Sequence, residues 1–241
     1  MTAYNIDDDY KAFIVPIHPN HGILLLYCTR KKSKGPHHQL PGGHVDKEDF
    51  DRAVMMSPGV RGANHLLLAC KIGAARELFE ETGIDLRKSL DRLKPLQLRS
   101  TNGSEDDELS CEFKKRLLFS VHISDNDMFI KGSGFVSAMN KNLRHLKLKL
   151  SHEHQGFVFE SSIVTATELL TKHSGGKISV ALKSAIDLGA IACELPADTT
   201  PDAPIVQHSD DELQVQENEI IPRSHKKNVF DCLDCCRAKW H

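Results

Sequence analysis

Residues 74–86 read A-A-R-E-L-F-E-E-T-G-I-D-L, and the interpretation of the whole chain depends on them. As an α-helix this stretch turns about 100° per residue, so Glu77, Glu80 and Glu81 share one face. Gly83 follows at the position where a left-handed residue commonly ends a helix. Like charges within two turns repel one another by roughly a few tenths of a kcal/mol per pair, whereas Mg²⁺ takes oxygen ligands in tight octahedral geometry. The sequence therefore predicts either a magnesium-binding helix face or a solvated acidic one.

A Gly-Gly turn lies upstream of this helix, where residues 40–46 read L-P-G-G-H-V-D. With it, the sequence resembles the signature of the Nudix hydrolase family, G-x5-E-x7-R-E-U-x-E-E-x-G-U, in which U is a bulky aliphatic residue. Gly43 and Asp49 match the first half, with Asp49 in place of the family's glutamate. The second half is matched in full by Arg76, Glu77, Leu78, Glu80, Glu81, Gly83 and Ile84.

The spacing between the two halves departs from the family pattern. Twenty-six residues separate them where the pattern has seven, so 19 extra residues interrupt the signature. We expect the interrupting segment, about residues 50–63, to form a loop ahead of one long helix over residues 64–82, with Asn64 as its N-cap. Gly73 in the middle of that helix costs about 1 kcal/mol relative to alanine. It therefore indicates a close backbone contact, for which the Gly-Gly turn is one candidate.

The resemblance covers about residues 10–190 and implies an α/β/α sandwich with a mixed β-sheet. Apolar and alternating stretches predict strands at residues 10–18, 22–29, 96–100, 114–123 and 145–151, and closing helices at residues 165–173 and 179–192. The second strand is apolar throughout, as expected of a strand that is buried on both faces. We therefore expect one domain over residues 1–193.

The composition limits the classes of function. The chain has 241 residues and a net charge of −2, so no global basic field argues for nucleic acid as a partner. No apolar stretch approaches the ~20 residues of a membrane span, and no signal peptide is seen at the N-terminus. Seven scattered cysteines fit reduced thiols better than a disulfide framework. A cytoplasmic protein is expected, and its oligomeric state is not indicated.

Residues 194–241 differ in composition from the rest of the chain. Prolines and acidic residues dominate, and few bulky apolar side chains are available to offset the entropy of ordering. We expect a disordered acidic tail with a cysteine-rich end. Cys232 and Cys235 form a single C-x-x-C, which could contribute to a zinc site. A flexible, modifiable end is the favoured interpretation.

The resemblance implies roles for the signature residues. The metal ligands that it implies, for Mg²⁺ or Mn²⁺, are Glu77, Glu80, Glu81 and a backbone carbonyl of the Gly-Gly turn at Gly43. Arg76 would orient a glutamate and pair with the first acid of the signature, which is Asp49 or, if the register slips, Glu48. Arg76 and Glu80 are also expected to act in catalysis.

The general base is expected from a segment downstream of the signature. Residues 151–155 read S-H-E-H-Q and resemble the corresponding stretch of the family's diadenosine tetraphosphate hydrolases, which makes Glu153 the candidate base. Asp106 and Glu108 in an acidic loop are the alternatives, and Glu153 could also be an ordinary exposed glutamate at a strand end. The histidine pair on either side of Glu153 is interpreted as a strand end rather than a metal site.

The substrate is predicted as a nucleotide. Phe157 lies where the resemblance places an aromatic residue close to the base, and it could stack on a nucleobase. Lys32 and Lys34 belong to a basic loop that is either a solvated connection or a contact to substrate phosphates. The expected activity is metal-dependent cleavage of a phosphoanhydride bond in a nucleoside diphosphate linked to another moiety, for example a dinucleoside polyphosphate. A coenzyme A or ADP-sugar pyrophosphatase, and an inactive nucleotide-binding protein of the same family, are the alternatives.

Overall fold

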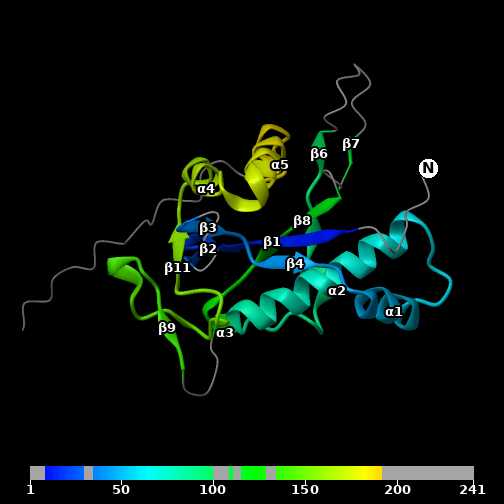
Figure 1. Ribbon diagram of the computed structural model, residues 1–241, viewed down its shortest axis with the longest axis horizontal. Coiled ribbons are helices and arrows are strands. Elements are labelled where there is room, and N and C mark those ends of the chain that lie inside the picture. The colour runs from blue at the N-terminus through cyan, green and yellow to red at the C-terminus, as the bar shows by residue number, and fades with distance from the viewer. Residues whose placement is uncertain (1–8, 30–34, 100–108, 111–114, 129–133, 192–241) are drawn as a thin grey trace, which may run out of the picture. The chain divides into compact units, whose positions relative to one another are not determined.

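The computed structural model describes residues 9–29, 35–99, 109–110, 115–128 and 134–191 (Figure 1). Lys32, Lys34, the acidic loop with Asp106 and Glu108, and the predicted tail of residues 194–241 lie outside these residues. Within them, no helix is long and apolar enough to cross a membrane.

A mixed β-sheet forms the centre of the fold. Its five principal strands run in the spatial order β11 (Gly156–Glu160), β2 (Gly22–Cys28), β1 (Lys11–His18), β8 (Arg116–His122) and β5 (Lys94–Pro95). Two short strands, β3 (His37–Gln39) and β4 (Gly42–His44), pair with β2 and β1. β1 is antiparallel to β2 and parallel to β8, with Ile17 opposite Ile23 in the first pair and Ile14 opposite Phe119 in the second.

Helices cover both faces of this sheet. The long helix α2 (Ala63–Thr82) lies on one face, with α1 (Lys47–Met56) and the short α3 (Asp125–Met128) on the same side (Figure 1). α4 (Ile163–Leu169) and α5 (Lys177–Asp187) lie on the other face and are joined through the 3-10 segment η3 (His173–Gly176). The predicted α/β/α sandwich with a mixed sheet is therefore confirmed.

The alternation of side chains along the strands produces two cores. Leu24 and Leu26 of β2 pack into the core on the α2 side. Ile23 and Leu25 pack into the core on the side of α4 and α5. Because successive strand residues point to opposite faces, a central strand covered on both sides is apolar at every position.

The remaining elements are short. They are η1 (Leu90–Arg92), β6 (Leu98–Arg99) paired with β7 (Leu109–Ser110), β9 (Val136–Ser137) paired with β10 (Lys147–Leu148), and η2 (Lys141–Leu143). The strand predicted at residues 145–151 is reduced to β10. Its predicted alternation still holds, because Leu146 and Leu148 are buried while Lys147 and Lys149 are exposed.

The segment expected to be a loop is largely helical, so that expectation was wrong. Residues 47–56 form α1, and α2 begins at Ala63 with Gly62 at its N-cap in place of Asn64. α1 is stabilised by contacts distant in sequence, including a hydrogen bond between the His65 ring and the carbonyl oxygen of Phe50 at 3.2 Å. The end of α2 is as predicted, because Gly83 is left-handed (φ 79°) and its N–H donates to the carbonyl of Phe79.

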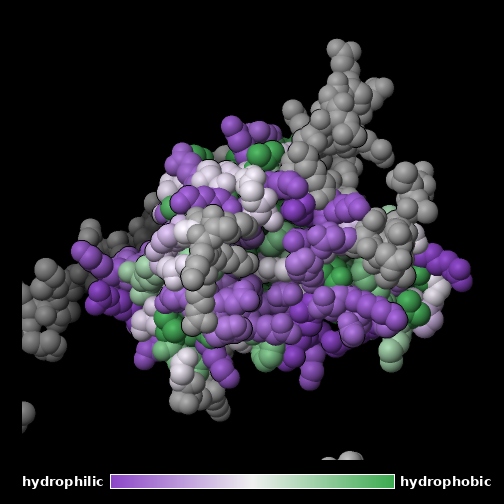
Figure 2. Space-filling view, in the orientation of Figure 1, coloured by the Kyte–Doolittle hydropathy of each residue, from purple (hydrophilic) through white to green (hydrophobic). Residues whose placement is uncertain are grey.

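The surface is mostly polar. Hydrophilic residues dominate the face shown in Figure 2. Among the described residues, three exposed apolar side chains follow one another near the end of α1, namely Val54, Met55 and Met56.

Candidate active site

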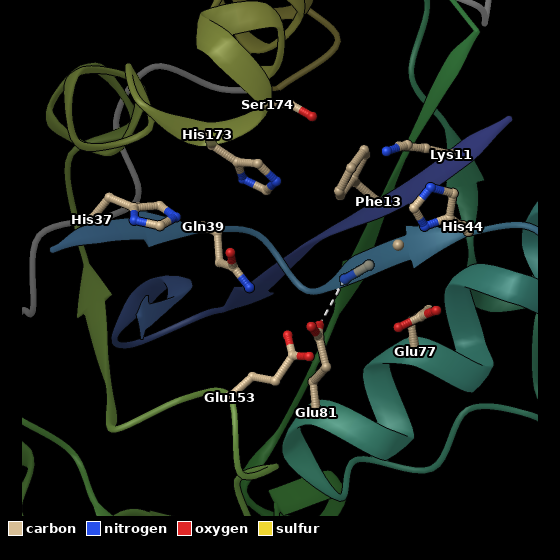
Figure 3. Close-up of a pocket in the computed structure, with 12 residues that line it drawn as sticks. Lys11, Phe13, His37, Gln39, His44, Glu77, Glu81, Glu153, His173 and Ser174 are labelled. Atoms are coloured by element: carbon tan, nitrogen blue, oxygen red, sulfur yellow. Dashed lines mark hydrogen bonds between the residues drawn. The ribbon is translucent and has the colours of Figure 1, made fainter. Parts of the chain in front are cut away.

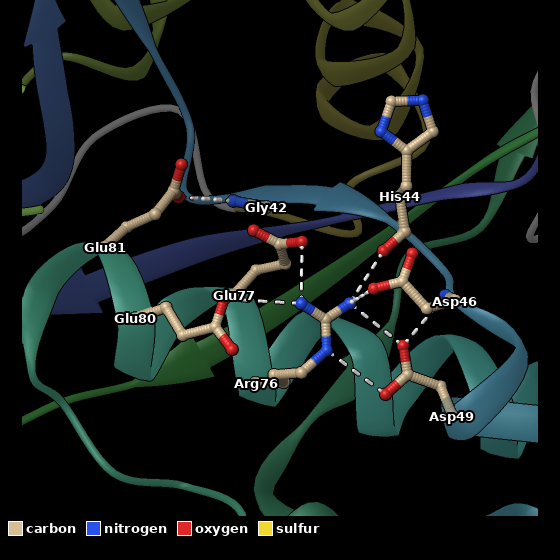
Figure 4. A network of polar contacts seen from close by, with 8 residues as sticks. All are labelled: Gly42, His44, Asp46, Asp49, Arg76, Glu77, Glu80 and Glu81. Atoms are coloured by element: carbon tan, nitrogen blue, oxygen red, sulfur yellow. Dashed lines mark hydrogen bonds and ion pairs between the residues drawn. The ribbon is translucent and has the colours of Figure 1, made fainter. Parts of the chain in front are cut away.

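The two glycines predicted to form a turn lie in strand β4, beside the carboxylates of α2. The N–H of Gly42 donates to Oε2 of Glu81 at 2.8 Å. A Cβ at Gly43 would lie 2.8 Å from the carboxylate of Glu77, closer than side chains pack, so any side chain here would displace that carboxylate. Gly42 has φ 137°, and a Cβ there would meet the carbonyl oxygen of Ala12 at 2.3 Å. Gly42 thus reaches Glu81 through its N–H (Figure 4), and the missing side chain at Gly43 lets the backbone approach Glu77.

Arg76 organises the acidic residues around it (Figure 4). Its Nη2 lies 3.0 Å from Oδ2 of Asp49, and its Nε lies 3.3 Å from Oδ1 of the same carboxylate. Nη1 donates to Oε1 of Glu77 at 3.0 Å, and Nη2 also contacts Asp46 and the carbonyl oxygen of His44, both at 3.0 Å. The contacts that the resemblance implied for Arg76 are thus present in the structure.

Of the two acids expected to pair with Arg76, Asp49 is the one that contacts it. Its side chain is 4% exposed and faces Arg76, whereas Glu48 is exposed. Burial lowers the pKa of Arg76, but the hydrogen bonds and charge of Asp49 and Glu77 outweigh it, so the net shift is upward. Arg76 therefore stays charged at every physiological pH.

The close contact predicted at Gly73 is with Asp49 rather than with the Gly-Gly turn. A Cβ at Gly73 would lie 2.9 Å from Oδ2 of Asp49 and 3.5 Å from the Cα of Val45. The space beside α2 is therefore filled by the shorter acid, and the extra methylene of a glutamate at position 49 would have to be accommodated against the helix.

Glu77 and Glu81 form the pair of acids nearest the turn. They lie one helical turn apart, and their side chains are 18% and 11% exposed. Burial raises the pKa of Glu77, although the charge of Arg76 opposes the shift. A pair of carboxylates this poorly exposed to solvent attracts a cation, because each is costly to keep charged where little water reaches it.

Glu80 is separated from this pair. Its carboxylate turns toward Nη1 of Arg76 at 3.4 Å, and its side chain is 53% exposed. The helical wheel placed all three acids on one face. Glu80 nevertheless does not line the pocket beside the other two acids.

A pocket of about 400 Å³ opens beside the two acids (Figure 3). Gly42, Gly43, His44, Glu77, Glu81 and Glu153 line one part of it. Lys11, Phe13, His37, Gln39, His173 and Ser174 line the other. The structure thus brings Glu153 next to residues more than 70 positions earlier in the chain, and the carboxylates of Glu153 and Glu81 point toward one another (Figure 3).

Several of the pocket residues were not predicted from the sequence, among them His173, Ser174 and Lys11. His173 is buried, and its Nδ1 accepts a hydrogen bond from the N–H of Leu40 at 3.0 Å. Ser174 has a positive φ of 51°, which is uncommon for a residue other than glycine. The sequence signal for this turn is the glycine pair at 175–176, which lies between the two predicted closing helices. Lys11 comes from the start of β1, where no local pattern marks it.

Phe157 does not occupy the position expected of it. Its side chain is fully buried in the core on the α2 side, in edge-to-face contact with Phe159 at 6.0 Å between ring centroids. The prediction that Phe157 stacks on a substrate was therefore wrong. Strand parity accounts for the difference, because residues 157 and 159 of β11 point to the same face of the sheet.

A second group of possible metal ligands lies at the end of the β1–β2 hairpin. Ligand atoms of His18, His21 and Asp125 lie within 4.8 Å of one another. Nδ1 of His18 accepts a hydrogen bond from the N–H of Asn20 at 3.2 Å, so the ring proton resides on Nε2, which faces Asp125 at 3.4 Å. This geometry favours a buried hydrogen-bonded histidine over a metal ligand.

Comparisons with known proteins give similarity at the level of structure only. No protein-family model matches the chain, and no curated protein sequence matches it significantly. The chain is similar to the MutT protein of Methanosarcina mazei Go1 at 15% identity and a TM-score of 0.36, over 76% of this chain and 96% of that one. It is also similar to an Ap4A hydrolase of C. elegans, at 16% identity and a TM-score of 0.36, over 76% of this chain and 99% of that one. A NUDIX hydrolase of Nitrosomonas europaea is similar at 17% identity and a TM-score of 0.36, over 80% of this chain and 95% of that one. Identities this low transfer no activity to this chain.

Proposed function

We propose that this chain is a Nudix-type hydrolase that cleaves a phosphoanhydride bond in a nucleoside diphosphate linked to another moiety. One observation carries the proposal: Glu77, Glu81 and Glu153 converge on one pocket, beside the two glycines of β4, of which Gly43 leaves room for Glu77. Separate helix and loop segments supply these acids, so their convergence is not a consequence of local sequence. A dinucleoside polyphosphate is the proposed substrate class, on the basis of the S-H-E-H-Q segment.

The residues present fit a hard divalent cation. Glu77 and Glu81 offer carboxylate oxygens one turn apart, and the missing side chain at Gly43 leaves the backbone close to Glu77. Mg²⁺ or Mn²⁺ prefers such oxygen ligands. Glu80 would join them only after leaving Arg76. When bound, the metal would neutralise charge on the substrate phosphates and lower the pKa of a coordinated water.

Arg76 and Glu153 have separate tasks in this proposal. Arg76 fixes one oxygen of Glu77 and is itself fixed by Asp49, so the ligand keeps its orientation when substrate arrives. Glu153 is exposed at the mouth of the pocket and would accept the proton of the attacking water as general base. On the opposite wall, the ammonium group of Lys11 would attract the phosphate chain.

Hydrolysis of diadenosine tetraphosphate, ADP-ribose and coenzyme A with Mg²⁺ and Mn²⁺ tests the proposal. Glu81→Gln should remove nearly all metal-dependent turnover, and Glu153→Gln should lower kcat about a hundredfold or more with a smaller change in KM. Glu48→Gln, an exposed acid on α1, serves as the matched control. Tight nucleotide binding without turnover would show an inactive nucleotide-binding protein, and wild-type turnover by folded Glu81→Gln would contradict the site.

Competition among the three substrates decides between the substrate classes. When they are supplied together, the proposal predicts the highest kcat/KM for diadenosine tetraphosphate. A clear preference for coenzyme A or ADP-ribose would replace the substrate class and leave the hydrolytic chemistry standing.

A further inference from the structure

His154 is a buried histidine in direct contact with a proposed metal ligand. Its side chain is fully buried, and its Nε2 lies 3.6 Å from Oε1 of Glu81. The same nitrogen contacts the side-chain amide of Gln39, and Nδ1 lies 2.9 Å from Oγ of Ser151. The other oxygen of Glu81 accepts the N–H of Gly42. One oxygen of this carboxylate is therefore hydrogen-bonded to the backbone, and the other lies against the His154 ring.

The segment that carries His154 is attached to the end of α2. The N–H of Ser151 donates to the carbonyl oxygen of Glu81 at 3.2 Å, and the N–H of His154 donates back to the carbonyl oxygen of Ser151 at 3.2 Å. These bonds close a tight turn over residues 151–154. Glu153 is the exposed residue of that turn and lies immediately before the buried histidine.

We propose that His154 is a positioning residue that couples the base to the metal site. Its ring joins Ser151, at the start of the turn that carries Glu153, to the carboxylate of Glu81. The terminal torsion of a glutamate is broad and weakly restrained on its own. A buried ring against one oxygen restricts that torsion, as outer partners of metal ligands commonly do. The inference rests on the proposed function and assigns a role to a residue outside the signature.

His154→Ala and His152→Ala form a matched pair of variants. The two histidines lie on either side of Glu153, but His152 is exposed and His154 is buried. Binding of Mn²⁺ alone, measured by electron paramagnetic resonance without nucleotide, gives a readout independent of turnover. His154→Ala should weaken Mn²⁺ binding by about tenfold or more and lower kcat for diadenosine tetraphosphate. His152→Ala should stay within about twofold of the wild type in both.

A double variant tests whether His154 acts through Glu81. In the Glu81→Gln background the ligand is already lost, so adding His154→Ala should change Mn²⁺ binding no further. An equal loss in both backgrounds would show a general structural role and overturn the inference. Ser151→Ala removes only the contact to Nδ1; if His154→Ala does not fold, it is the deciding variant and should lower kcat several-fold at unchanged Tm.

The possible failures are distinct. Folded His154→Ala, or failing that Ser151→Ala, with wild-type Mn²⁺ affinity and kcat would overturn the inference while Glu81→Gln still upholds the proposed function. A wild-type protein that neither binds Mn²⁺ nor hydrolyses any substrate would overturn both.

Discussion

Gly73→Ala should destabilise this protein, against the ordinary preference of helices for alanine. Gly73 lies inside α2, where alanine would normally gain about 1 kcal/mol. The added Cβ would lie 2.9 Å from Oδ2 of Asp49, a carboxylate held by two bonds to Arg76 and one from the N–H of Asp46 at 3.0 Å. Either the helix or the carboxylate must move, and the carboxylate is the more mobile of the two.

The magnitude follows from what Asp49 would lose. Hydrogen bonds to charged groups contribute about 1.5–3 kcal/mol each. Arg76 is 25% exposed and keeps Asp46 and Glu77, so a total loss of about 2–3 kcal/mol is a reasonable expectation. After subtracting the helix preference of alanine, Gly73→Ala should cost about 1–2 kcal/mol of unfolding free energy. In an Asp49→Ala background the obstruction is gone, and the same substitution should stabilise by up to about 1 kcal/mol.

Urea unfolding of the wild type, the two single variants and the double variant at neutral pH measures this coupling. Glu48→Ala, on the exposed side of α1, is the control and should change stability by less than about 0.5 kcal/mol. A stabilising Gly73→Ala in the wild type, or the same effect in both backgrounds, would refute the contact between Gly73 and Asp49.

Three further predictions concern other parts of the chain. Asp127→Asn should cost about 1 kcal/mol of unfolding free energy at neutral pH, because hydrogen bonds from Arg92 hold the pKa of Asp127 at about 2, below its ordinary 3.8. This stabilisation is present above about pH 4 and is lost as the pH falls toward 2. Urea unfolding across that range should therefore show the stability difference between the variant and the wild type closing. Phe157→Ala should lower the free energy of unfolding by about 3–5 kcal/mol in the same assay and leave KM unchanged. A raised KM at wild-type stability would instead support stacking of Phe157 on the substrate. A chain ending at residue 193 should keep the Tm and kcat of the full chain, whereas stoichiometric zinc lost with the tail would favour a metal site at Cys232 and Cys235.

The parts of the fold that depend on local patterns could be predicted from the sequence. β1 and β2 were predicted because each is a run of apolar residues next to a turn, and such a pattern is visible in the sequence without knowledge of the neighbouring strands. The end of α2 at Gly83 was predicted because a left-handed cap is a property of one residue. The contact between Asp49 and Arg76 came from the family resemblance, and the structure shows it at 3.0 Å.

The rest could not be predicted because distant segments determine it. α1 buries only Asp49, Phe50 and Ala53, which is too few for an apolar stripe to mark a helix. Asp46 followed by Asp49 was a capping pattern that could have indicated its start. The pocket wall formed by Lys11 and the residues of β3 and η3 has no local signature apart from the glycine pair at 175–176. Along β11 the alternation shows that Phe157 and Phe159 share a face, but not that this face is the core.

The long segment between Asp49 and Arg76 does not disturb the site, because contacts between side chains, and not the number of residues between them, bring the acids and the arginine together. The 26 residues between Asp49 and Arg76 continue α1, turn, and form the first part of α2. Their helices pack together through the His65–Phe50 hydrogen bond and the approach of Asp49 to Gly73, and Cys70 is buried in the same core. The entropic cost of ordering these residues is thus offset by the contacts that they make themselves. The number of residues between the halves of the signature therefore constrains this site less than the pairing of Asp49 with Arg76.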